Sequence, residues 1–259
     1  MKPSTRSLQV SFLALILASL LSAPYCNGEG SKISGALTIV SDYTFRGISQ
    51  TMEEPAIQGG FDYEFENHLY LAYWASNVSG ESYDQGSSEM DFVLGKRFEL
   101  EDEVELDLGA TFFYYSGAKT QGASSESYDT LEAYFGISWR SWNVYYRRSL
   151  NDWFGVNENN PFNLSASPNG GSDGSTYLSL GYTFPGPKNL SFSLHMGKTT
   201  VANYEDASYS DIVLKATWSL QEFDFGLAYV DSNADEDLYS SDGKDLGDSR
   251  IVASIVRSF

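Results

Sequence analysis

Only two histidines, His68 and His195, are available in the 259-residue sequence to act as a general base or a metal ligand. His195 alternates with Ser191 and Ser193 in an apolar-polar pattern, so the three side chains share one face of a predicted strand. A serine beside a histidine is the minimum for nucleophilic hydrolysis. A lone histidine on a polar strand face is, however, more often a hydrogen-bonded lining residue than a base. His68 falls in a predicted turn far from His195, so the two offer no zinc site. We therefore expect no enzymatic activity and no cofactor.

An acidic stretch near the C-terminus has the spacing of a calcium-binding loop. Oxygen-bearing residues stand at positions 1, 3, 5, 7 and 12 of that spacing, namely Asp231, Asn233, Asp235, Asp237 and Asp242. Glu236 stands where the loop needs a glycine, and Asp242 is shorter than the usual glutamate. A solvated acidic loop is the favoured interpretation, and a weak divalent-cation site is the alternative.

The overall charge narrows the range of partners. The sequence has 16 Lys and Arg against 35 Asp and Glu, a formal net charge of −19. We expect no nucleic-acid partner, because a protein that neutralises the phosphates of a nucleic acid needs a basic face and this chain is strongly acidic. The chain also contains 18 Tyr, 16 Phe and 5 Trp, far more aromatic residues than a disordered acidic chain carries. A single cysteine rules out an intramolecular disulfide framework.

The first 28 residues have the pattern of an export signal. Lys2 and Arg6 precede an apolar stretch over residues 12–21, which is too short to cross a bilayer as a helix. Cleavage after Gly28 would remove Cys26 and leave residues 29–259 as one domain. Since no later segment approaches 18 consecutive apolar residues, membrane insertion would have to use strands.

Alternating apolar and polar residues divide the remaining chain into segments of about ten residues. We expect twelve strands, at 33–46, 55–66, 68–78, 88–99, 103–116, 127–139, 142–150, 174–184, 189–199, 209–220, 222–231 and 248–259. Their connections alternate without exception between tight turns and longer polar loops. Outer-membrane barrels have this asymmetry, with short turns at the periplasmic rim and long loops outside. The pattern predicts an all-β fold, a transmembrane antiparallel up-and-down β-barrel with both termini in the periplasm.

The polar strand faces should then line the lumen. Nine acids and four bases fall on these faces: Asp42, Asp62, Glu64, Asp91, Glu105, Asp107, Glu132, Asp211 and Asp224, with Arg46, Arg97, Arg147 and Lys215. We expect Arg46 to pair across the ladder with an acid of the second strand or of a neighbour of the last strand. The excess of acids predicts a lumen that favours cations or neutral solutes.

The last strand carries a pattern typical of outer-membrane barrels. Apolar residues alternate back from a terminal aromatic residue, at Ile251, Ala253, Ile255 and Phe259. We expect this pattern to engage the barrel-assembly machinery, and the outer surface to contact outer-membrane lipid and lipopolysaccharide. Divalent cations held weakly by the acidic loop would bridge lipopolysaccharide.

Three segments near the start of the predicted barrel carry a family resemblance. These are Ser41-Asp42-Tyr43-Thr44-Phe45-Arg46-Gly47-Ile48-Ser49, then Pro55-Ala56-Ile57-Gln58-Gly59-Gly60-Phe61-Asp62-Tyr63, then Trp74-Ala75-Ser76-Asn77-Val78. In order and spacing they resemble the opening of the TorF-type porins, a proteobacterial outer-membrane family of formerly unknown function. Ala75 departs from the glycine expected at its position. The resemblance implies an outer-membrane barrel with a pore, and it supplies no substrate or catalytic residues.

The sequence therefore favours a Gram-negative outer-membrane porin for passive diffusion of small solutes. One alternative is a non-conducting barrel that acts as an adhesin or stabilises the envelope, since a twelve-stranded lumen can be filled by side chains. A second alternative is a secreted, soluble β-sandwich that binds carbohydrate. The longest loop, residues 151–173, could fold into the pore or project outside, and its residues do not decide between the two.

Overall fold

The structure, a computed structural model, describes residues 31–83, 86–100, 103–120, 126–159 and 170–259. The predicted export signal, residues 1–28 with Cys26, lies outside the described residues. Among the described residues, no helix combines the length and the apolar character needed to cross a bilayer.

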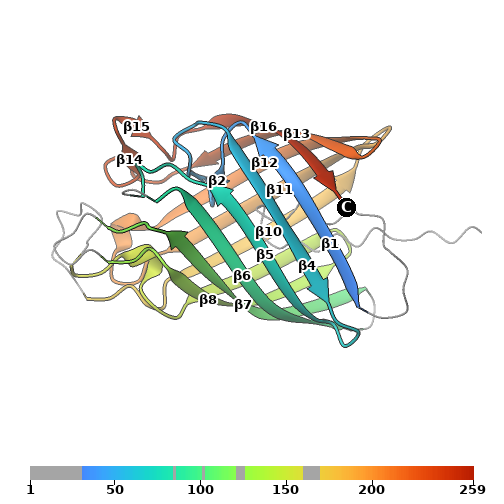
Figure 1. The fold of residues 1–259 in the computed structure, drawn as a ribbon, viewed down its shortest axis with the longest axis horizontal. Helices are drawn as coiled ribbons and strands as arrows, with labels where there is room; N and C mark the ends of the chain where they lie inside the picture. The colour runs from blue at the N-terminus through green and yellow to red at the C-terminus, as the bar shows by residue number, and fades with distance from the viewer. Residues whose placement is uncertain (1–30, 84–85, 101–102, 121–125, 160–169) are drawn as a thin grey trace, which may run out of the picture.

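Twelve long strands close into one antiparallel barrel (Figure 1). They are β1 (Lys32–Val40), β4 (Ala56–Glu64), β5 (Leu69–Asn77), β6 (Ser88–Glu99), β7 (Val104–Ser116), β8 (Thr130–Trp139), β9 (Trp142–Ser149), β10 (Thr176–Pro185), β11 (Leu190–Thr200), β12 (Tyr209–Leu220), β13 (Phe223–Ser232) and β16 (Arg250–Ser258). Each pairs with its neighbours in sequence, and β1 pairs with β16 to close the ring, with Ile39 opposite Ile255. The predicted barrel is confirmed, and the soluble β-sandwich is wrong.

The outer surface of the barrel is an apolar band. In β1, for example, Ile33, Leu37 and Ile39 are exposed, whereas Ala36 and Thr38 between them are buried. The same alternation runs around the ring, because successive strand residues point to opposite faces of a sheet. A wide apolar exterior around a polar interior suits lipid outside and water inside. The fold and its surface are those of an outer-membrane protein.

The connections differ at the two ends of the barrel, as the sequence predicts. Tight turns at one end contain residues with positive φ, including His68 (61°), Arg140 (53°) and Gln221 (56°). The longer connections gather at the other end, called the loop end below. They contain two short 3-10 turns, η1 (Trp153–Gly155) and η2 (Glu205–Ala207), and two small hairpins, β2–β3 (Thr44–Phe45 with Ile48–Ser49) and β14–β15 (Ser240–Ser241 with Lys244–Asp245).

The predicted first strand, 33–46, is wrong at its C-terminal end. The wall strand β1 ends at Val40, and residues 41–55, called the inner loop below, fold into the barrel. Its hairpin β2–β3 turns at Arg46 (φ 49°) and Gly47 (φ 84°), and two successive positive φ values are the signature of a type I′ hairpin turn. Gly47 also lies so close to β12 that an added Cβ would come within 2.8 Å of the Asp211 Cβ. Only glycine fits this tip.

Tyrosines lie flat across glycines on the inner face of the wall. A Cβ at Gly109 would overlap the hydroxyl end of Tyr134, and a Cβ at Gly136 would overlap the ring of Tyr145. These glycines therefore let large rings fill the lumen from one side without pushing the wall outward.

Candidate functional site: the barrel lumen

The lumen has one bulky wall and one wall of small side chains. Strands β5 to β9 contribute large inward side chains, among them Tyr70, Trp74, Phe113, Tyr134 and Tyr145. Strands β10 to β13, β16 and β1 contribute mostly small ones: Ser179, Gly181, Ser191, Ser193, Gly197, Thr217, Gly226, Ala228, Ser254, Ala36 and Thr38. Any open path through the barrel must therefore run beside the small-residue wall.

Charged groups near the turn end form a network on the bulky wall. Arg97 Nη1 donates to Glu64 Oε2 at 2.8 Å, and its guanidinium lies 4.2 Å from the ring centre of Tyr70. The Tyr70 hydroxyl donates to Asp107 Oδ1 at 3.0 Å. Arg147 lies over the ring of Tyr145 at 5.1 Å. These contacts hold both signs of charge in fixed positions along the lumen.

The tip of the inner loop crosses the lumen to the opposite wall. Arg46 Nη2 lies 2.6 Å from Glu132 Oε2 of β8, and both side chains are almost fully buried. The Arg46 guanidinium also lies over the ring of Tyr177 at 4.3 Å. Tyr177 Oη is 2.7 Å from His195 Nε2 and donates to Asp211 Oδ2 at 3.1 Å. His195 is thus a hydrogen-bonded part of the lining.

The expected partner of Arg46 is wrong. Arg46 pairs with Glu132, far along the chain, because it sits on a hairpin inside the lumen and not on a wall strand.

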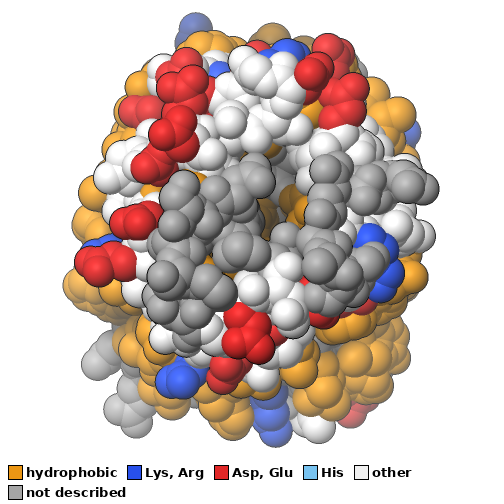
Figure 2. Space-filling model, turned by 90° about the vertical axis from the view of Figure 1, so that its left-hand side faces the viewer, with side chains coloured by type: hydrophobic (Ala, Val, Ile, Leu, Met, Phe, Trp, Pro, Cys, Tyr) orange, Lys and Arg blue, Asp and Glu red, His pale blue; other side chains and the backbone are white. Residues whose placement is uncertain are grey.

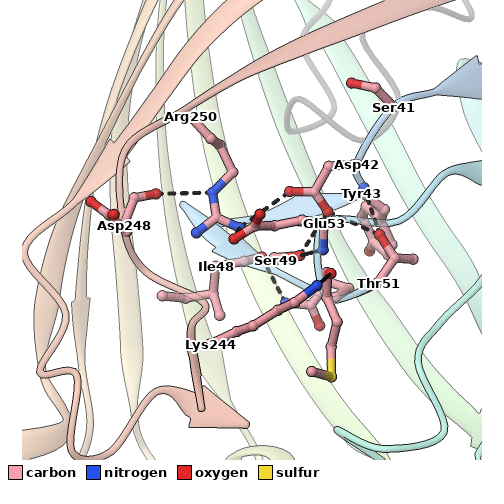
Figure 3. Close-up of polar contacts among 12 residues, drawn as sticks. Ser41, Asp42, Tyr43, Ile48, Ser49, Thr51, Glu53, Lys244, Asp248 and Arg250 are labelled. Atoms are coloured by element: carbon pink, nitrogen blue, oxygen red, sulfur yellow. Dashed lines mark hydrogen bonds and ion pairs between the residues drawn. The ribbon is translucent and has the colours of Figure 1, made fainter. Parts of the chain in front are cut away.

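A second ion pair holds the base of the inner loop (Figure 3). Asp42 Oδ1 accepts hydrogen bonds from Ser49 Oγ at 2.7 Å and Thr51 Oγ1 at 2.9 Å. Its other oxygen pairs with Arg250 of β16 at 3.2 Å. Lys244 donates to the carbonyl of Met52 at 2.9 Å. The inner loop is therefore fixed at its base by polar contacts from two sides.

Two buried carboxylates lie behind the inner loop. Glu89 and Asp91 point inward from β6 and are 0% and 2% exposed. The Tyr43 hydroxyl donates to Glu89 Oε2 at 2.9 Å. Burial, and next the negative charges of Glu89 and Asp91, raise the pKa of Tyr43 well above its ordinary value, so its phenol keeps the proton that it donates.

The structure places the residues predicted to line the lumen in two groups. Those on inward strand faces are Asp62, Glu64, Asp91, Arg97, Glu105, Asp107, Glu132, Arg147, Asp211, Lys215 and Asp224. Asp42 and Arg46 lie on the inner loop. Sequence reasoning missed Glu89 and Arg250, although Glu89 shares the face of Asp91 and Arg250 shares the face of Val252.

The residues of the predicted assembly pattern lie on the outer face, where Ile251 and Phe259 are strongly exposed. That placement leaves their role in assembly a prediction.

The acidic stretch with calcium-loop spacing does not form a cluster. Asn233 Oδ1 accepts from the Ser210 amide at 2.6 Å, and Asp235 Oδ1 accepts from the Asp237 amide at 2.9 Å. Asp231 accepts from the Tyr229 hydroxyl at 3.1 Å. Across the part of the chain that the structure describes, no three His, Cys, Asp or Glu side chains are arranged to hold a metal ion.

Aromatic side chains fill much of the lumen at the loop end. The described part of the 151–173 loop turns inward, where Phe154 packs on Phe45 and Phe113 at ring-centre distances of 5.7 and 5.6 Å. Below this layer, a cavity of about 100 Å³ lies beside the small-residue wall, between the inner loop and Lys215. Above it, a cleft of about 420 Å³ opens among the loops. Figure 2 shows the loop end hollowed near its centre, with acidic side chains around the rim.

Comparison with known proteins places the chain in a family. The sequence pattern of a family described as "Bacterial protein of unknown function (Gcw_chp)" matches residues 27–259. The chain belongs to the Gcw_chp family. Among curated proteins, none matches this sequence. The TorF-type name is not part of the family match and stays a prediction.

Solved porins share the fold of this Gcw_chp protein. The NanC porin has a TM-score of 0.53 at 12% identity, over 89% of this chain and 98% of that chain. The KdgM porin has a TM-score of 0.51 at 9% identity, over 88% of this chain and 99% of that chain. A structure of the KdgM porin in complex with disordered oligogalacturonate has a TM-score of 0.51 at 8% identity, with the same coverage of each chain. At these identities the likeness concerns the fold alone.

Proposed function

We propose that this protein is a narrow porin-like channel of the outer membrane, through which small cations and small neutral solutes diffuse passively. The observation that carries the proposal is a closed barrel whose inward-facing ionisable side chains are mostly acids. The likeness of the opening motif to the TorF-type porins agrees with it.

The lumen carries more acidic than basic side chains. Arg97, Arg46 and Arg250 are each within ion-pair distance of an acid, which offsets three negative charges. Among the inward residues named here, the acids outnumber the bases: Asp42, Asp62, Glu64, Glu89, Asp91, Glu105, Asp107, Glu132, Asp211 and Asp224 against Arg46, Arg97, Arg147, Lys215 and Arg250. Fixed negative charge in a narrow pore attracts cations and repels anions.

Because the lumen is acidic, the solutes proposed for this chain differ in charge from the compound bound in the solved KdgM porin structure. Oligogalacturonate is a polyanion, and the structure in question is a complex with it. Transfer of a polyanion through a lumen whose inward acids outnumber its inward bases would be opposed by like charge. We therefore assign small cations and neutral solutes, not acidic sugars, to this chain.

The inner loop sets the width of the proposed channel. It spans the lumen from Val40 to Glu132, and a cavity of about 100 Å³ lies beside it on the small-residue wall. A solute of a few heavy atoms matches such a passage, whereas a larger one requires the inner loop to move.

The non-conducting barrel is the second candidate, and a specific observation favours it. The layer of Phe45, Phe113 and Phe154 lies across the loop end, and all three side chains are buried. If this layer never opens, the barrel has no continuous water path and serves as an envelope-structural or adhesive protein.

Liposome swelling separates these candidates. The refolded protein, reconstituted into liposomes, should admit glycerol, glycine and a lysine salt faster than a glutamate salt of equal osmolarity. Equal rates for the lysine and glutamate salts would contradict the acidic-lumen proposal. No swelling with any solute, from a sample whose gel mobility shifts on heating as a folded barrel does, would establish the non-conducting barrel.

A further inference from the structure

We propose that the loop-end cleft is a binding site for an organic cation, a small ammonium compound with an apolar body. Nothing in the channel proposal requires such a site. The inference rests on the proposed function only in that solutes reach the cleft from outside the cell.

The floor and sides of the cleft are aromatic. Tyr83 stacks on Tyr115 with ring centres 4.7 Å apart and meets Tyr128 edge to face at 5.1 Å. The other rings that line the cleft are Phe45, Trp153, Phe154, Tyr209 and Tyr239. Its volume of about 420 Å³ lies in the range of small-molecule sites, which is about 300–1,000 Å³.

Two of the tyrosines that line the cleft direct their hydroxyl groups to protein partners. Tyr83 donates to Gln50 Oε1, and Tyr239 donates to the carbonyl of Ala207. Their hydroxyl groups are thus used within the protein, which leaves the rings as the surface that a ligand meets. The face of an aromatic ring carries negative partial charge and attracts a cation.

The charged side chains that line the cleft are all acidic. Glu81 and Asp242 line it and are exposed, and none of its described lining residues is Lys, Arg or His. An anion would find no cationic partner in this lining, whereas an organic cation finds both ring faces and carboxylates. The apolar lining residues Ile48, Leu238 and Leu246 provide contacts for its body.

Binding of benzyltrimethylammonium to the refolded protein in detergent, measured by calorimetry, tests this inference without any need for conduction. Choline and its neutral isostere 3,3-dimethylbutan-1-ol isolate the effect of charge, and we expect choline to bind about tenfold more tightly. Tyr128→Leu should weaken benzyltrimethylammonium binding about tenfold, and Tyr128→Phe, which keeps the ring, should bind within about twofold of the original protein. Glu81→Gln with Asp242→Asn should weaken it about threefold at low salt.

The control is Asp237→Asn, which removes a nearby acid that does not line the cleft and should leave binding unchanged. Equal binding of choline and its neutral isostere would overturn the cation assignment. Tighter binding of maltose than of benzyltrimethylammonium would show a sugar site instead. No binding of any probe by a heat-modifiable barrel would remove the site, and none of these outcomes decides whether the barrel conducts.

Discussion

Removal of the Arg46 guanidinium should release the inner loop and open the channel. Arg46 Nη2 lies 2.6 Å from Glu132 Oε2, and the side chains are 5% and 2% exposed. Breaking one partner of a buried ion pair costs about 3–5 kcal/mol, because the other charge stays buried without compensation. Since every 1.4 kcal/mol is a factor of ten, Arg46→Ala should raise the ratio of open to closed channels about a hundredfold or more.

Single-channel recording in planar bilayers measures this ratio directly. Arg46→Ala should give longer and larger openings than the original protein, and Glu132→Gln should shift the ratio in the same direction. Arg148→Ala is the matched control, since Arg148 lies next to the lumen residue Arg147 but faces outward. The double variant Arg46→Ala with Glu132→Ala should open less than the two single effects combined, because no unpaired charge remains.

The gating argument is refuted if folded Arg46→Ala barrels show the same conductance and open fraction as Arg148→Ala barrels. Heat-modifiable gel mobility identifies the folded samples. If Arg46→Ala does not fold, Glu132→Gln decides the question, because this substitution keeps the size of the side chain.

Three further predictions follow from the lumen and the wall. Glu89→Gln with Asp91→Asn removes two buried inward carboxyl groups and should lower the ratio of cation to anion permeability, measured as a reversal potential. An unchanged ratio would show that these acids do not contribute to the electrostatic field along the ion path. Gly136→Val should destabilise the barrel by roughly 1–3 kcal/mol, because the new side chain overlaps the ring of Tyr145, and thermal unfolding followed by circular dichroism measures the loss. Gly136→Ala should cost less, and equal stability of all three proteins would contradict the packing argument. Deletion of Phe259 should reduce the yield of heat-modifiable barrel in outer-membrane fractions, and an unchanged yield would leave this exposed residue without a role in assembly.

The strands of the barrel wall could be predicted because features of the nearby sequence determine them. Alternation in a segment such as Val104–Ser116 fixes which side chains face lipid, and the tight turns at His68, Arg140 and Gln221 fix the pairing of consecutive strands. A shift of one residue would turn every apolar side chain into the lumen, so the strand register is strongly determined.

The interior of the lumen could not be predicted in the same way. Residues 41–46 continue the alternation of the first strand, with Tyr43 and Phe45 between polar residues, whether they stay in the wall or fold inward. The available signal was Gly47, because glycine readily adopts the positive φ that a tight hairpin turn requires. The inward position of Trp153 and Phe154 depends on the space that side chains of distant strands leave in the lumen. The local sequence around these two residues does not indicate that space.

The reversal potential of the refolded protein in a planar bilayer, under a gradient of KCl, tests the central claim most directly. An acidic, narrow lumen predicts a potential of the sign that K⁺ selectivity produces, and the selectivity should weaken as salt concentration rises and screens the fixed charges. A potential of the opposite sign, or none from channels that do conduct, would contradict the account.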